Sequence, residues 1–191
     1  MEICCGCGAK LEKREGSHNR YGIASVSCWN HFNELAQERT RGYPDVHRLV
    51  VDAYAVQHPP NAELQKKLQI EPRLIEASIQ SVAIHLIALH FAIVQKTPLL
   101  EISKVMDRIL STGVIFPELD PPASRGSITV ANMPLTSDYD KYCDFANRWA
   151  HEAWNAWSEY HEVIEDWSSE LLTQLATYLV KEGERNARDT R

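Results

Sequence analysis

Residues 72–96 read PRLIEASIQSVAIHLIALHFAIVQK, and this stretch decides the class of fold. Pro72 suits the first turn of a helix, where its missing N–H has no partner to lose. Apolar side chains then recur around nearly the whole helical circumference: Leu74, Ile75, Ile79, Val82, Ile84, Leu86, Ile87, Leu89, Phe91, Ile93 and Val94. A helix that is apolar on all sides is buried at the centre of a bundle. The stretch therefore predicts an all-α fold built around this helix.

Further helical segments flank the central one. The apolar spacing and the positions of proline and glycine predict helices over Cys28–Arg39, Pro44–His58 and Leu99–Leu110, a helical turn over Ala62–Gln69, and a helical region from Ser137 to about Lys181. We expect the last region to break near Ser168 and Ser169, because an unbroken helix of that length is long for a small domain. A proline-rich connection over residues 114–136 is expected to hold a brief strand at Ser127–Val130.

These elements predict a helical bundle with a small N-terminal cysteine-rich zinc knob. We divide the chain into the knob (residues 1–30), the helical bundle (31–181) and a frayed charged tail (182–191). The chain has 191 residues, of which 44% are hydrophobic and 24% are charged, as expected for a folded soluble protein with a core.

Net charge and hydropathy limit the classes of partner and the location that we expect for this protein. The chain carries 20 Lys and Arg against 26 Asp and Glu, for a formal charge of −6. This acidic balance argues against nucleic-acid and anionic-membrane partners, which need a basic footprint. The N-terminus lacks the layout of a signal peptide, and the most apolar stretch, Ser81–Val94, is too short to span a bilayer. We therefore expect a cytoplasmic protein.

Four of the five cysteines lie within the first 28 residues. In a reducing compartment such clustering favours metal ligation over disulfides. Cys4 and Cys7 form a two-thiolate knuckle followed by glycine, Cys28 begins a predicted helix, and His31 follows one turn later. This spacing predicts a closed, structural zinc site with Cys4, Cys7, Cys28 and His31 as ligands. Cys5 or a more distant histidine is an alternative fourth ligand, and a redox-active CCGC pair is the alternative to zinc.

Three histidines on separate predicted helices are candidates for a second site. His58 ends a helix, His85 lies beside small side chains on the central helix, and His161 interrupts a stripe of tryptophans. Each also has an ordinary interpretation, as a helix cap, a hydrogen-bonded core residue or part of an apolar stripe. If they converge, they would form a catalytic-type metal or ligand site with Asp52 as a further candidate. The candidate ligand-binding residues around it are Tyr54, Trp154 and Trp157.

Several short motifs together resemble an uncharacterised family of bacterial proteins. They are Cys4-x2-Cys7-Gly, Cys28-Trp29, DAYAVQHP at residues 52–59, Ser81-x3-His85-Leu86, and WAxxxWxAWxxxH at residues 149–161. The resemblance extends from Cys4 to about Trp167, and DAYAVQHP is its most specific part. It implies that the cysteine knob, Asp52, His58, His85 and His161 belong to the family pattern, whereas His31 and His151 do not. Cys5 stands where the more usual CPxCG knuckle has proline.

The resemblance implies no reaction, so three classes of function stay open. They are a metal-dependent enzyme, a protein that binds a small molecule without turnover, and an interaction module. We favour a zinc-binding protein whose histidine-lined site binds or acts on a small molecule. The alternative is a zinc-stabilised interaction or regulatory module without catalysis. The sequence lacks the common motifs for phosphate binding, serine hydrolysis, zinc proteolysis and heme attachment, namely GxxxxGK[ST], GxGxxG, GxSxG, HExxH and CxxCH. The sequence therefore does not decide whether the protein is an enzyme.

Overall fold

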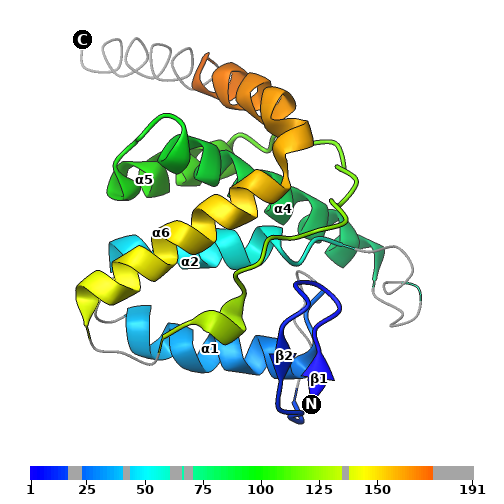
Figure 1. The fold of residues 1–191 in the computed structure, drawn as a ribbon. Helices are drawn as coiled ribbons and strands as arrows, with labels where there is room; N and C mark the ends of the chain where they lie inside the picture. Colours follow the sequence, from blue (N-terminus) through cyan, green and yellow to red (C-terminus); the bar gives the residue numbers. More distant parts are fainter. Residues whose placement is uncertain (17–22, 41–43, 61–65, 67–70, 135–137, 174–191) are drawn as a thin grey trace, which may run out of the picture.

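Helices dominate the computed structural model, which describes residues 1–16, 23–40, 44–60, 66, 71–134 and 138–173 (Figure 1). Strands β1 (Glu2–Ile3) and β2 (Lys10–Leu11) form a small antiparallel sheet at the N-terminus. The helices are α1 (Val26–Thr40), α2 (Pro44–Val56), α4 (Pro72–Ile93), α5 (Leu99–Ser111) and α6 (Tyr139–Ala156), with short 3-10 helices η1 (Val130–Asn132) and η2 (Ser158–Tyr160) and a further helical segment over residues 161–173. The predicted all-α fold with an N-terminal cysteine-rich knob is confirmed.

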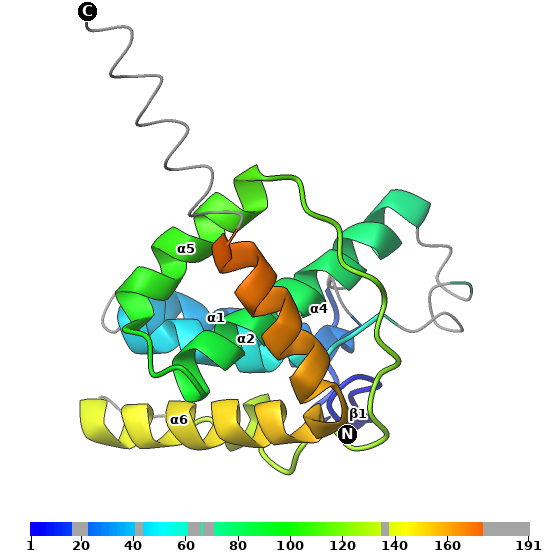
Figure 2. The same ribbon diagram turned by 90° about the horizontal axis from the view of Figure 1, so that it is seen from above.

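Helix α2 lies at the centre of the packing and contacts α1, α4, α5 and α6. Its side chains Val50, Ala53 and Val56 are completely buried, because neighbouring helices cover it on several sides. Helix α6 runs beside α2, and residues 161–173 lie over α4 (Figures 1 and 2). Three hydrogen bonds of Gln57, which follows the end of α2, tie this helix end to α6 and to the preceding connection. The Trp149 indole N–H donates to the Gln57 side-chain oxygen at 3.0 Å, and the Gln57 amide donates to two backbone carbonyls of the connection.

Helix α4 begins at Pro72, as predicted, and most of its residues from Val82 to Phe91 are buried, with His85 half-buried. The helix spans 22 residues, whereas the stretch Ser81–Val94, which by itself is too short to cross a bilayer, covers only its C-terminal part. By length and composition it is sufficient to cross a membrane, with a mean hydropathy of 1.5, yet 56% of the apolar window is buried inside the protein. The core helix of a soluble protein has the same combination of features.

The strand predicted at Ser127–Val130 is wrong. Within the described connection, residues 127–129 run as single chain and Val130 begins η1. The Thr129 amide donates to the Asn132 side chain at 2.8 Å, which caps this 3-10 turn locally. The carbonyl of Ile128 accepts from Gln57 instead of from a neighbouring strand. Side-chain partners thus satisfy the backbone here, and no sheet forms.

The predicted break near Ser168 and Ser169 is also wrong, because the long helical region breaks at Trp157. Trp157 leaves helical geometry (φ −96°, ψ 20°), and its indole N–H donates to the Val56 carbonyl at the end of α2. Ser168 stays helical since its hydroxyl donates to the Ile164 carbonyl one turn earlier. The predicted turn over residues 62–69 lies almost entirely outside the described residues, as do the predicted helix end near Lys181 and the tail.

Candidate functional site

Three cysteines and one histidine meet in the interior, where the N-terminal knob joins the helices. The ligand atoms of Cys4, Cys7, Cys28 and His58 all lie within 4.8 Å of one another, and all four residues are buried. The sulfurs of Cys7 and Cys28 are 3.8 Å apart. The His58 Nε2 atom lies 3.5 Å from the Cys4 sulfur and 3.4 Å from the Cys28 sulfur. This group can bind a metal ion.

Tight backbone turns place the cysteines. The amide of Cys4 donates to the Ala9 carbonyl at 2.9 Å, and the Gly8 amide donates back to the Cys4 carbonyl at 3.0 Å. Gly8 closes this turn with a φ of +75°, a conformation that favours glycine. Cys28 lies in the first turn of α1, where its amide donates to the Ser25 hydroxyl. The amide of Ser25 in turn points at the Cys4 sulfur at 3.4 Å. Amide dipoles directed at a sulfur stabilise the thiolate form that binds metals.

His58 follows the C-terminal end of α2 and is 1% exposed. Its Nδ1–H donates to the Tyr54 carbonyl at 2.6 Å, which leaves the lone pair of Nε2 directed at the sulfurs. The His58 carbonyl accepts from the Ile23 amide, so the segment before α1 is held against this helix end. Gly6 completes the enclosure. A β-carbon there would lie 2.2 Å from the Ile23 oxygen and 2.3 Å from the His58 ring, so only glycine fits.

The ionisation of this group is strongly coupled. Contacts with the Cys4 and Cys7 sulfurs, together with burial, raise the pKa of Cys28 far above its ordinary value. Burial and its contact with Cys28 raise the pKa of Tyr54. Burial lowers the pKa of His58, but its contacts with Cys4 and Cys7 outweigh burial and raise that pKa to about 9. Several groups therefore compete for few protons in a buried space, and a bound cation would stabilise the thiolates together.

His31 and Cys5, the nearer candidates for a fourth ligand, lie outside the group of four. His31 is half-buried one turn after Cys28, where burial and the charge of Arg14 lower its pKa. Cys5 is exposed. The sequence left a more distant histidine open as the fourth ligand but indicated His58 as a candidate for another site. The sequence feature that could have identified His58 as a ligand is its position at a helix end, in the segment VQHPP at residues 56–60.

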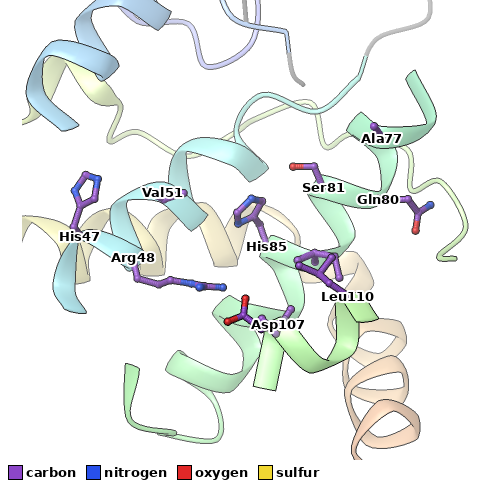
Figure 3. A pocket seen from close by; sticks show the side chains of 11 residues that line it. His47, Arg48, Val51, Ala77, Gln80, Ser81, His85, Asp107 and Leu110 are labelled. Carbon is purple, nitrogen blue, oxygen red and sulfur yellow. The ribbon is translucent and has the colours of Figure 1, made fainter. Parts of the chain in front are cut away.

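His85 lies away from the metal group and pairs with Asp52. Its Nδ1–H donates to Asp52 Oδ1 at 2.6 Å; the Asp52 side chain is 1% exposed and that of His85 is 21% exposed. Arg48 Nε lies 3.5 Å from Asp52 Oδ2. His85 lines a cavity of about 700 Å³ between α2, α4 and α5 (Figure 3). Its polar lining comprises His47, Arg48, Gln80, Ser81, His85 and Asp107.

The three candidate histidines do not converge, because each is held by different neighbours. His161 stacks on the Trp154 ring at 3.9 Å between centroids, and its Nε2–H donates to the Trp154 carbonyl. Trp157 is buried against the end of α2 through its bond to Val56. The Tyr54 hydroxyl lies 3.7 Å from the Cys28 sulfur of the metal group. None of these aromatic residues lines the His85 cavity. They contribute instead to core packing and to the surroundings of the metal group.

Comparison with known proteins adds a family but no reaction. No curated protein and no solved structure matches the chain. The model of one protein family matches residues 2–158, which include every residue of the metal group and of the His85 cavity. The chain therefore belongs to DUF5946, a family of unknown function.

Proposed function

We propose that the Cys4, Cys7, Cys28 and His58 group holds one zinc ion. Zinc in proteins has tetrahedral geometry, with Zn–S distances of about 2.3 Å and Zn–N distances of about 2.0–2.1 Å. Such a tetrahedron places two sulfurs about 3.8 Å apart and a nitrogen about 3.5 Å from each sulfur. The observed separations are 3.8 Å between Cys7 and Cys28, and 3.5 and 3.4 Å from His58 to Cys4 and Cys28. This agreement carries the proposal.

The zinc is structural, since four protein ligands leave no open coordination position. The ion joins residues 4–7 and the start of α1 to the end of α2. Before α1, the described residues of the N-terminal segment form a single small sheet with two residues in each strand. A metal therefore supplies the folding energy that a segment of this size lacks.

The second part of the proposed function is binding of a small molecule in the cavity beside His85. A cavity of about 700 Å³ falls within the usual size range of small-ligand sites. It combines an apolar wall with a few polar groups, and one of these is an imidazole oriented by a buried carboxylate. This feature favours ligand binding over a pure interaction module, because a module needs no buried Asp52–His85 pair at a cavity.

Two measurements test the two parts separately. Elemental analysis of the purified protein should find about one zinc per chain, and Cys7→Ser should lose it. The neutral fluorescent probe N-phenylnaphthylamine should bind the wild type but not Ala77→Trp, which fills the cavity. Ala131→Trp is the matched control, because Ala131 is exposed on η1 away from the cavity. Zinc retained in Cys7→Ser, or equal probe binding by both tryptophan variants, would contradict the respective part.

A further inference from the structure

We propose that the cavity between α2, α4 and α5 takes a small organic monoanion with an apolar body, such as an amphipathic carboxylate, held at its charged end by Arg48 and His85. This inference rests on the proposed small-molecule site and names the chemical class of its ligand. It follows from the division of the cavity into an apolar wall and a polar end whose donors are incompletely used.

The apolar wall fits the body of such a ligand. Val51 of α2, Ala77 and Ile84 of α4, and Met106 and Leu110 of α5 line the cavity. Leu110 is 59% exposed, so this wall continues to the surface. A hydrocarbon chain or ring on these side chains would remove apolar surface from water on both partners. The wall therefore favours ligands with an apolar body over fully polar metabolites.

Arg48 supplies hydrogen-bond donors that the described part of the chain leaves unused. A guanidinium carries five N–H donors, and Arg48 makes one hydrogen bond to the residues that the structure describes, from Nη1 to the Ser103 hydroxyl at 3.2 Å. Its buried Nε has no hydrogen-bond partner among the described residues and faces Asp52 at 3.5 Å. Figure 3 shows the guanidinium extending along the cavity toward α5. A carboxylate would accept from these donors with the planar geometry that guanidinium groups favour.

His85 supplies the second contact and balances the charge. Its Nδ1 is occupied by Asp52, and its Nε2 has no hydrogen bond to the described part of the chain. Apart from Asp52, the titratable and charged groups facing it are Arg48 and His47 of α2 and Asp107 of α5. At the polar end of the cavity, the positive charge of Arg48 and the negative charge of Asp52 cancel each other. A monoanion is therefore neutralised when His85 takes up one proton and donates from Nε2.

Asp107 determines which way round the ligand would lie in the cavity. Its carboxylate is exposed at the α5 side of the cavity. It would repel a ligand anion placed near it, although solvent screens that repulsion. The charged end of the ligand is thus expected at Arg48 and His85, and Asp107→Asn should strengthen anion binding.

Calorimetric titration with octanoate and with octanol tests the class of ligand, since the two share an apolar chain and differ in the charged end. Octanoate should bind the zinc-loaded wild type more tightly than octanol. Arg48→Gln should weaken octanoate binding about tenfold or more, as expected for a charge-assisted contact, and leave octanol binding nearly unchanged. Arg148→Gln on the exposed face of α6 is the matched control. Asp107→Asn should tighten octanoate binding and provides a surface variant if Arg48→Gln fails to fold.

Proton uptake tests the role of His85. Titrations in two buffers of different ionisation enthalpy should show proton uptake when octanoate binds, and His85→Gln should abolish it. Equal affinities for octanoate and octanol, or no effect of Arg48→Gln and Asp107→Asn, would overturn the inference while the small-molecule site stands. Failure of octanoate, octanol and N-phenylnaphthylamine to bind would overturn both.

Discussion

Replacement of His58 and of His31 by alanine decides between two histidines that the chain offers as the fourth metal ligand. His58 Nε2 lies within 3.5 Å of two cysteine sulfurs, whereas His31 lies outside the group of four ligands. His58→Ala therefore removes one corner of the tetrahedron and opens it to water. His31→Ala removes a half-buried side chain and leaves the four ligands unchanged.

The size of the effect follows from the contacts of each ring. Loss of a residue that only orients a ligand costs about 10- to 100-fold in metal affinity. Loss of the His58 ligand should cost at least the upper figure, about 100-fold, which corresponds to about 2.7 kcal/mol. The hydrogen bond to the Tyr54 carbonyl is lost as well, which adds about 1 kcal/mol to the destabilisation of the fold. For His31→Ala we expect less than about twofold, as for most surface substitutions.

Competition for zinc against a chromophoric chelator measures these affinities directly, with circular dichroism as the control for folding. The expected order is wild type equal to His31→Ala, and both well above His58→Ala. If His31→Ala released the zinc and His58→Ala retained it, the assignment of His58 would be wrong. The spacing of Cys28 and His31 would then have identified the ligand.

Two further perturbations test the helical body by urea denaturation. Trp149→Phe should lower the free energy of unfolding by about 1–3 kcal/mol, because the completely buried Gln57 oxygen loses its indole donor; an unchanged unfolding midpoint would contradict this. Burial lowers the pKa of His47, so its contribution to stability is present above the ordinary histidine pKa of about 6.5 and is lost as the pH falls below that value. The wild type should therefore lose stability from pH of about 7 to about 5, and His47→Gln should lose less; equal losses would refute the role of His47.

Much of the fold could be predicted because the decisive signals are local. Pro72 and the apolar pattern that follows it predict a largely buried helix without any knowledge of its neighbours. The prediction that this helix is the central one is wrong, because α2 lies at the centre of the packing. The break at Trp157 was missed because its cause is tertiary. The indole N–H of Trp157 reaches the Val56 carbonyl, a partner about one hundred residues earlier in the chain. Ser168 carries a local helix-breaking signal, but its hydroxyl is satisfied within the helix by Ile164.

The residues of the candidate site also fall into those that local sequence could identify and those that depend on tertiary packing. Cys4, Cys7 and Cys28 could be recognised from their crowding in a short segment, whereas the approach of His58 depends on how α2 packs beside α1. The sequence also singled out Asp52 and His85, but as parts of one site with His58. In the structure the Asp52–His85 pair lies on the cavity side of α2 and His58 at its C-terminal end. Spacing along a helix gives the face of a residue, and only tertiary packing gives its partner.

Helix α2 also bears on the division of the chain into a knob and a bundle. A boundary at residue 30 assigns Cys4, Cys7 and Cys28 to the knob, yet His58 belongs to the helical body. A metal held by all four would crosslink these two parts, much as a disulfide would, instead of stabilising the knob alone. The same helix carries Arg48 about three turns and Asp52 about two turns before His58. A metal that fixed its C-terminal end would thus also fix one wall of the cavity, and it would help to shape the proposed ligand site.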